Sequence, residues 1–277
     1  MTSTAAGMPE GGQEDGAPLV RLERHGDGGH VLEIVLDRPA ALNAVSTAMA
    51  AALVRVTREV AHDDRVRCVV VSSSQDRAFC VGADLKERHT LTDAELVRQR
   101  PGNRAAYGGI LALPVPAVAA VEGFALGGGF ELALACDLVV AGEGAIVGLP
   151  EVSVGVIPGG GGTQLLTRRI GWSKAASLIF TARRIGAGEA FALGCIDEVV
   201  ATGTARARAL GLAATIAEHS PVGLRQAKRA MRLGSDLDLE AGLEIEDNCW
   251  RQAAFSGDRA EGVAAFAEKR RPSWPGR

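Results

Sequence analysis

Residues 123–132 (GFALGGGFEL) contain the pattern that decides the fold class of this chain. They follow an apolar run at 116–121 and lead into apolar residues at helical spacing, which predicts a strand, a glycine turn and a helix. Backbone amides at a helix N-terminus carry the positive end of the helix dipole, and glycines let another group approach them closely. The segment therefore predicts either an anion-stabilising turn or tight packing between a strand and a helix.

Two glutamates stand in the most glycine-rich and apolar third of the chain, Glu131 in this segment and Glu151 in residues 149–155 (LPEVSVG). A buried carboxylate must be paired, hydrogen-bonded or shifted in pKa, and shifted carboxylates perform general acid–base catalysis near neutral pH. Taken singly, Glu131 also fits a salt-bridged helix residue, and Glu151 fits a helix-dipole partner or a loop carboxylate. Taken together, they predict an acid–base pair that acts on one substrate.

The composition is that of an ordinary soluble globular protein. With 277 residues and 47% hydrophobic content, the chain can bury one large core, with or without a smaller helical appendage. Its formal net charge of −3 and pI near 6.0 are not those of a basic, nucleic-acid-binding protein. No apolar run reaches the roughly 18 residues that a membrane-spanning helix needs. We therefore expect neither a nucleic-acid partner nor a membrane partner.

Cysteine and histidine usage gives no sign of a metal centre. The chain has five residues of each type, widely scattered, and neither set shows the spacing of a zinc site. We therefore expect no bound metal, reduced thiols and a cytoplasmic location. The cysteines are Cys68, Cys80, Cys136, Cys195 and Cys249.

The chain divides into three predicted regions. Residues 1–18 are rich in small and polar residues without a secretory signal pattern, which predicts a disordered tail. Residues 19–200 alternate strand-like and helical segments, beginning with a hairpin at 19–36, and predict an α/β core. Residues 201–277 predict an α-helical region, in which Ser220 and Pro221 begin one helix.

Capping signals place further helix boundaries. Thr92 and Glu95 have capping-box spacing, and Pro101 closes the short helix that they open, before a second helix that ends near residue 111. This polar segment, which begins at Thr92 and separates two apolar regions, predicts a mobile lid. Asp258 stands three residues before Glu261 and predicts another helix start.

Four motifs occur together in a fixed order: residues 37–44 (DRPAALNA), 79–85 (FCVGADL), 123–132, and 150–164 (PEVSVGVIPGGGGTQ). In combination they resemble the enoyl-CoA hydratase/isomerase (crotonase) family, over about residues 19–269. The resemblance implies an α/β spiral of strand–strand–helix units with C-terminal helices as a trimerisation region. It also implies homotrimers that often pair into hexamers, and an acyl-CoA thioester as the substrate. CoA then belongs to the substrate, and no separate cofactor is expected.

The same resemblance implies roles for five residues. The amides of Ala83 and Gly128 match those that hold the thioester oxygen. Glu131 matches the residue that orients and deprotonates water for attack at C3, and Glu151 matches the residue that donates a proton to C2. The amide of Gly159 helps to hold the water. Because both acids are present, the resemblance favours a hydratase that adds water to a 2-trans-enoyl-CoA and gives the 3-hydroxyacyl-CoA.

The resemblance nominates Lys86 and Lys269 for the CoA phosphates, the latter from a neighbouring subunit; a solvated charge is the alternative for each. Two other functions stay open at this point. One is another crotonase-type reaction on an acyl-CoA, either double-bond isomerisation or thioester hydrolysis. The other is a non-catalytic or RNA-binding homologue, which the acidic charge balance disfavours.

Overall fold

The computed structural model describes residues 13–14 and 17–277, so the predicted tail at 1–18 lies mostly outside the described residues. In the described residues of this tail, β1 (Gln13–Glu14) and β2 (Ala17–Pro18) pair as a short antiparallel ribbon. Among the described helices, none is both long and apolar enough to cross a bilayer. All five cysteines are buried and unpaired.

The larger sheet of the described chain has the strand order β12-β9-β7-β5-β4-β3. The predicted hairpin is confirmed, because β3 and β4 pair antiparallel, whereas the other neighbours pair in parallel. A parallel sheet covered on both faces needs apolar side chains on both sides of each strand, which explains the valine and alanine runs. The strands are β3 (Val20–His25), β4 (Val31–Leu36), β5 (Cys68–Ser73), β7 (Ala117–Val121), β9 (Leu138–Gly142) and β12 (Glu198–Val200).

A smaller sheet has the order β11-β10-β8-β6 in the described residues. Its strands are β6 (Ala78–Cys80), β8 (Phe124–Leu126), β10 (Ile146–Gly148) and β11 (Ile185–Gly186). Successive strand pairs such as β5–β6 and β7–β8 place one strand in each sheet, and a helix then leads to the next pair. This repetition is the predicted spiral of strand–strand–helix units.

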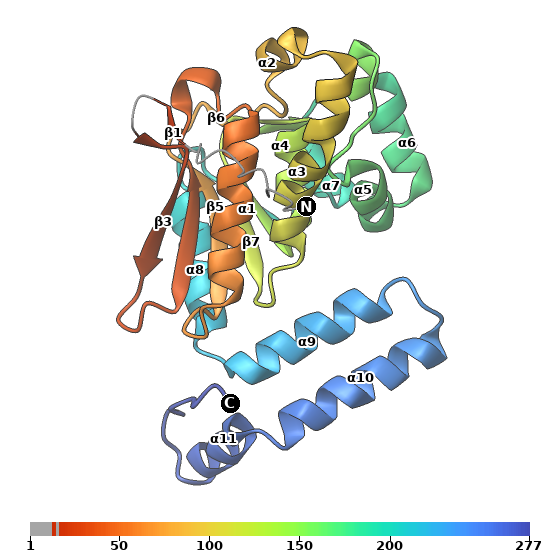
Figure 1. The fold of residues 1–277 in the computed structure, drawn as a ribbon. Coiled ribbons are helices and arrows are strands. Elements are labelled where there is room, and N and C mark those ends of the chain that lie inside the picture. The colour runs from red at the N-terminus through yellow and green to blue at the C-terminus, as the bar shows by residue number, and fades with distance from the viewer. Residues whose placement is uncertain (1–12, 15–16) are drawn as a thin grey trace, which may run out of the picture.

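Helices cover both faces of the larger sheet (Figure 1). On one face lies α1 (Thr47–Ala61), which is capped by Ser46 and buries Met49, Leu53 and Val56. On the other face lies α8 (Ala205–Ala217), which buries an alanine at every fourth position against valines of the sheet. Small side chains allow this helix to approach the strands closely. The predicted 201–277 region therefore includes one helix that packs on the sheet.

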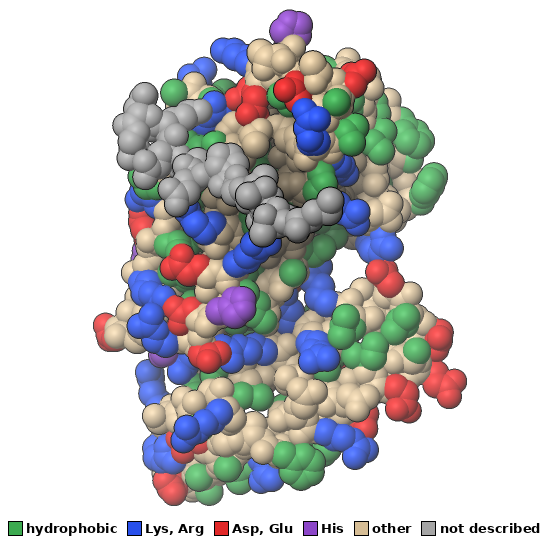
Figure 2. Space-filling model, viewed as in Figure 1, with side chains coloured by type: hydrophobic (Ala, Val, Ile, Leu, Met, Phe, Trp, Pro, Cys, Tyr) green, Lys and Arg blue, Asp and Glu red, His purple; other side chains and the backbone are tan. Residues whose placement is uncertain are grey.

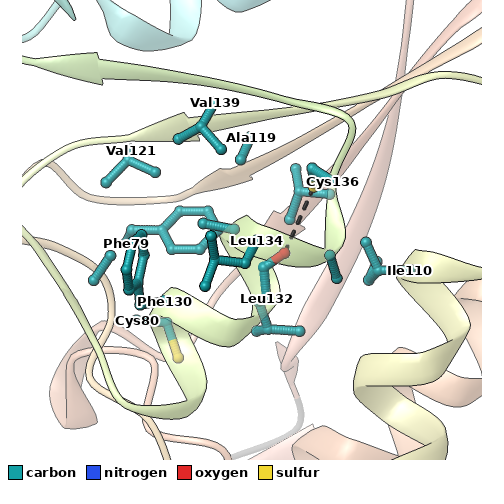
Figure 3. Close-up of a cluster of buried hydrophobic side chains, with 14 of the residues drawn as sticks. Phe79, Cys80, Ile110, Ala119, Val121, Phe130, Leu132, Leu134, Cys136 and Val139 are labelled. Carbon is teal, nitrogen blue, oxygen red and sulfur yellow. Dashed lines mark hydrogen bonds between the residues drawn. The ribbon is translucent and has the colours of Figure 1, made fainter. Parts of the chain in front are cut away.

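The glycine turn leads into α4 (Gly128–Ala135), as predicted, and every residue of this helix is buried. Figure 3 shows its apolar side chains Phe130, Leu132 and Leu134 among residues of the strands and of α3. The thiol of Cys136 donates a hydrogen bond of 3.6 Å to the carbonyl of Leu132 at the end of the helix. Burial on all sides fixes the position of any polar group that α4 carries.

The predicted break at Pro101 is wrong: α3 runs without interruption over Asp93–Leu111, from the predicted capping box at Thr92. Pro101 is exposed, so the carbonyl that loses its helical hydrogen bond lies on the solvent side of the helix. The opposite face buries Ala106, Tyr107 and Ile110, and this packing continues the helix past the proline. A short helix, α2 (Leu85–Thr90), precedes it and is capped by Asp84.

Three helices follow α4 and β10 on the same side of the molecule (Figure 1). They are α5 (Gly162–Ile170), α6 (Trp172–Thr181) and α7 (Ala187–Leu193). The last three described helices form a separate layer away from the sheets (Figure 1), namely α9 (Pro221–Gly234), α10 (Leu239–Ala254) and α11 (Gly257–Ala267). The predicted start at Ser220 and Pro221 is confirmed.

The predicted cap at Asp258 is wrong, because Ser256, two residues earlier, caps α11. The carboxylate of Asp258 is buried and accepts hydrogen bonds from the Ser220 hydroxyl and from the amides of Val222 and Gly276. It therefore joins α9, α11 and the C-terminal segment, a role that its local sequence does not reveal.

Candidate active site

Glu131 lies in the first turn of α4 and is only 2% exposed. Its Oε1 atom accepts hydrogen bonds of 2.7 Å from the amide of Gly160 and 2.7 Å from the amide of Gly162. These two donors stand at the start of α5, where backbone amides lack helical partners and the helix dipole favours a negative charge. Of this glycine run, the sequence predicts a role only for Gly159, whose amide is expected to help hold the water.

The pKa of Glu131 is the result of opposed effects. Burial raises it and is the largest effect, so the pKa lies above its ordinary value. The amides of Gly162, Gly160 and Gly159 lower it, as does the positive charge of Arg100. The glycine run thus stabilises the ionised carboxylate in a place that would otherwise favour the protonated form.

Glu151 begins a short 3₁₀ turn, Glu151–Val154, after β10. Its Oε1 atom would lie 3.0 Å from a methyl group placed on Gly127, so it faces the glycine turn. Its Oε2 atom is buried and has no hydrogen-bond partner in the described part of the chain. Burial is the main cause that raises the pKa of Glu151 to about 7, and the negative charge of Glu131 adds to it. The structure therefore brings the two predicted acids together beside one turn.

The amides of Ala83 and Gly128 lie on two segments that contact each other. A methyl group on Gly82, whose φ is +91°, would lie 2.9 Å from the Gly128 nitrogen and 2.8 Å from the Leu126 carbonyl oxygen. Within residues 13–14 and 17–277, neither amide donates a hydrogen bond to the protein. Gly128 is the first residue of α4, which leaves its N–H free for a ligand. Two such donors form a place for a developing oxyanion.

The motif at residues 37–44 holds the Ala83 segment in position. The Arg38 guanidinium donates to the Asp84 carboxylate at 2.6 Å and to the Ala44 carbonyl at 3.0 Å. The buried Asn43 amide donates to the Phe79 carbonyl at 2.9 Å. These bonds tie the loop after β4 to the loop after β6 and fix the direction of the Ala83 amide.

The sequence profile of the enoyl-CoA hydratase/isomerase family matches residues 26–277. This chain belongs to that family. It is 42% identical over 259 residues to the probable enoyl-CoA hydratase 2, mitochondrial, of Arabidopsis thaliana, which covers 93% of this chain and 86% of the relative. It is 41% identical over 267 residues to the human mitochondrial methylglutaconyl-CoA hydratase, which covers 95% of this chain and 78% of the relative.

Solved structures confirm the crotonase fold. An enoyl-CoA hydratase from Bacillus anthracis matches with a TM-score of 0.90 at 37% identity, over 94% of this chain and 100% of that chain. The expected α/β crotonase spiral with C-terminal helices is therefore correct. Identities near 40% establish the family but leave the individual reaction to be argued from the site.

Tyr107 of α3 is a component of this crotonase-family site that the sequence analysis missed. It is 6% exposed and is the single tyrosine of the chain. Its Oη would lie 2.2 Å from a methyl group on Gly128, and its Cγ 2.6 Å from one on Gly160. Burial raises its pKa, with Glu131 among the charges that add to the effect, so the phenol stays neutral. The tyrosine occupies the space that side chains at both glycines would need.

The two nominated lysines lie in different places. Lys86 is exposed on α2, three residues after Ala83, and so stands beside the amide pair. Lys269 is exposed just after α11, and Figure 1 shows α2 and α11 at opposite ends of the molecule. A single chain therefore brings only Lys86 to the neighbourhood of the site.

One group in the described residues has metal-ligand spacing, Glu23, His25 and Glu33, and it lies on the β3–β4 hairpin. The guanidinium of Arg206 pairs with both glutamates, and Ser72 donates to Glu33 at 2.5 Å. A cationic side chain thus already neutralises these carboxylates, and an ion-pair network around the buried Glu33 accounts for the cluster.

The raised pKa of Glu151 makes stability depend on pH. Because the folded-state value of about 7 exceeds the ordinary 4.5, the folded protein holds this proton more tightly than the unfolded chain does. The resulting stabilisation is complete below about pH 4.5 and disappears as the pH rises to about 7. We expect Glu151→Gln, which cannot ionise, to raise the melting temperature relative to wild type more at pH 8 than at pH 5.

Thermal melts at the two pH values, followed by circular dichroism, measure this difference. Glu143→Gln, at an exposed position, is the matched control and should show no pH-dependent difference. An equal offset of Glu151→Gln from wild type at both pH values would contradict the assignment.

Proposed function

We propose that this protein is an enoyl-CoA hydratase, which adds water across the double bond of a 2-trans-enoyl-CoA to give the 3-hydroxyacyl-CoA. One observation carries the proposal: the buried Glu131 and the half-buried Glu151, whose carboxylates differ in their hydrogen bonds, converge beside two unpaired backbone amides. The Arabidopsis relative, a probable enoyl-CoA hydratase, supports the choice.

In this mechanism the thioester oxygen accepts hydrogen bonds from the amides of Ala83 and Gly128. Glu131, whose charge the amides of the glycine run stabilise, takes a proton from water while the water oxygen bonds to C3. The electron pair of the double bond moves onto the thioester as an enolate. Preorganised donors stabilise such a charge strongly, and loss of one typically slows a reaction by about 10²–10³.

Glu151 completes the addition. With a pKa of about 7 it holds a proton near neutral pH, and it donates this proton to C2 as the enolate collapses. The product has gained one water, and exchange with solvent returns Glu131 and Glu151 to their starting protonation states. The sequence of steps uses no metal and no redox cofactor.

The presence of two acids favours hydration over its closest alternative. A double-bond isomerase moves one proton between two carbons, which a single carboxylate can do. Here Glu131 has its own pair of amide donors, apart from Glu151, and this arrangement suits a base that acts on water rather than on carbon.

The direct test follows crotonyl-CoA with the purified protein. We expect the absorbance of the conjugated thioester to fall and mass spectrometry to show a product heavier by one water. Thiol titration should show no release of free CoA, and a 3-enoyl-CoA should not be converted at a comparable rate. Thiol release, or rapid conversion of the 3-enoyl-CoA without hydration, would instead establish thioester hydrolysis or isomerisation.

We also propose that the C-terminal helices mediate assembly into a homotrimer or a hexamer. Figure 2 shows hydrophobic side chains on the surface of this layer, and its large exposed residues include Met231 at 75%, Leu239 at 78% and Phe266 at 88%. Apolar surface of this extent marks an interaction site. An assembled form would allow Lys269 of one chain to reach the site of a neighbour.

Analytical ultracentrifugation of the full chain tests the assembly, and a sedimenting species of one chain mass at micromolar concentration would contradict it. Replacement of Phe266 with aspartate is expected to shift the distribution toward monomer. Arg98→Gln, at an exposed position on α3, should leave the distribution unchanged.

A further inference from the structure

Arg100 is a cation near Glu131 that has no hydrogen-bond or ion-pair partner among the described residues. In the described part of the chain, the guanidinium of Arg100 makes neither an ion pair nor a hydrogen bond, whereas Arg38, Arg206 and Arg270 each pair with a carboxylate. The residue is exposed as a whole, so a ligand can reach its side chain.

The position of Arg100 relative to the glycine run is well defined. Its Nη1 would lie 3.1 Å and its Nη2 3.4 Å from a methyl group on Gly159. A methyl group on the next residue, Gly160, would lie 2.8 Å from Glu131 Oε2. The guanidinium and the carboxylate therefore lie against adjacent glycines. The charge of Arg100 acts on Glu131, although the two side chains form no ion pair.

The proposed function fixes the direction of a bound acyl chain. With the thioester oxygen on the amides of Ala83 and Gly128, C2 faces Glu151 and C3 faces Glu131. Because the Glu131 carboxylate and the Arg100 guanidinium lie beside the adjacent residues Gly160 and Gly159, atoms beyond C3 come within reach of Arg100. The acyl group therefore passes the unpaired guanidinium.

An uncharged acyl chain would suit this position poorly. It would remove water from the guanidinium and offer no acceptor in exchange, which carries a free-energy penalty. A carboxylate on the chain would accept two parallel hydrogen bonds from the guanidinium, the geometry in which arginine binds carboxylates best.

We infer that Arg100 is a specificity-determining residue that binds a carboxylate at the far end of the acyl chain. The substrate class is then a short 2-enoyl-CoA that carries a terminal carboxylate. This inference rests on the proposed function for the orientation of the chain.

The test compares two short 2-enoyl thioesters, glutaconyl-CoA with a terminal carboxylate and crotonyl-CoA without one. Wild type should show the higher kcat/KM with glutaconyl-CoA. Arg100→Gln should lower kcat/KM for glutaconyl-CoA by about 10- to 100-fold more than for crotonyl-CoA, the range of a charge-assisted pair. Removal of the Arg100 charge from the neighbourhood of Glu131 affects both substrates alike, so the difference between them reports the carboxylate contact. Arg100→Lys should recover part of the loss, and Arg98→Gln on the same helix should change neither substrate.

An equal loss of kcat/KM on both thioesters would overturn the inference, because Arg100 would then act only through Glu131 or through the CoA portion, which both substrates share. A wild-type preference for crotonyl-CoA would also overturn it.

A binding experiment separates this inference from the proposed function. Calorimetry with saturated glutaryl-CoA and butyryl-CoA measures recognition without hydration. If neither enoyl thioester is hydrated but glutaryl-CoA binds more tightly and loses this advantage in Arg100→Gln, the hydratase proposal fails and the carboxylate site stands. If crotonyl-CoA is hydrated but glutaryl-CoA shows no advantage, the hydratase proposal stands and the carboxylate site fails.

Discussion

Glu131→Gln is expected to lower kcat for crotonyl-CoA hydration by about 10²–10⁴, the range that a positioned general base contributes. Glutamine keeps an oxygen that can accept hydrogen bonds from the amides of Gly160 and Gly162, so the glycine run stays in place. It cannot take a proton from water. We expect KM to change little, because the amides proposed to hold the thioester oxygen are untouched.

Glu151→Gln should have a loss of similar size, for the complementary reason that C2 loses its proton donor. Steady-state kinetics with the two variants and with the exposed Glu143→Gln as control measure both effects. Circular dichroism should show unchanged folding in all three. Wild-type rates for either active-site variant would remove that residue from the mechanism.

Gly129→Ala is the substitution from which we expect the largest loss of stability. A methyl group there would lie 1.9 Å from the carbonyl oxygen of Cys80, a backbone atom of β6 that cannot rotate away. Either α4 or β6 must move, and overpacking of this severity costs about 3 kcal/mol or more. Movement of α4 would also displace the Gly128 amide and Glu131, so activity should fall together with stability.

The matched control is Gly211→Ala, which replaces a helical glycine of α8 that has nothing within 4 Å of the new methyl group. This substitution is expected to stabilise the protein by about 0.5–1 kcal/mol. Chemical denaturation of both variants measures the two changes in the free energy of unfolding. A Gly129→Ala variant as stable as wild type would show that α4 is less tightly held than the geometry indicates.

Features governed by local chemistry were predictable from the sequence. Ser46 begins α1 because its hydroxyl accepts the amide of Met49, and Thr92 begins α3 through a reciprocal bond with Glu95. The strand, glycine turn and helix around Gly128 follow from periodicity and from the conformational freedom of glycine.

Features that depend on packing between distant segments were not predictable in the same way. Pro101 carries a strong local signal to end a helix, but burial of Ala106 and Ile110 continues α3 through it. The donors to Glu131 stand 29 and 31 residues further along the chain, and only the contact between α4 and α5 brings them there. The local sequence around Asp258 is that of a helix cap, but its hydrogen-bond donors, Ser220 and Gly276, lie in other segments.

The packing of Tyr107 against both Gly128 and Gly160 has a consequence for redesign of the pocket. The ring fills the volume beside Gly128 and beside Gly160, whose amide donates to Glu131, so positions 107, 128 and 160 share a single space. Enlarging either glycine alone produces a collision, and shrinking the tyrosine alone leaves a void next to charged groups. Engineering libraries that aim at longer or branched substrates should therefore vary positions 107, 128 and 160 jointly and retain compensating combinations.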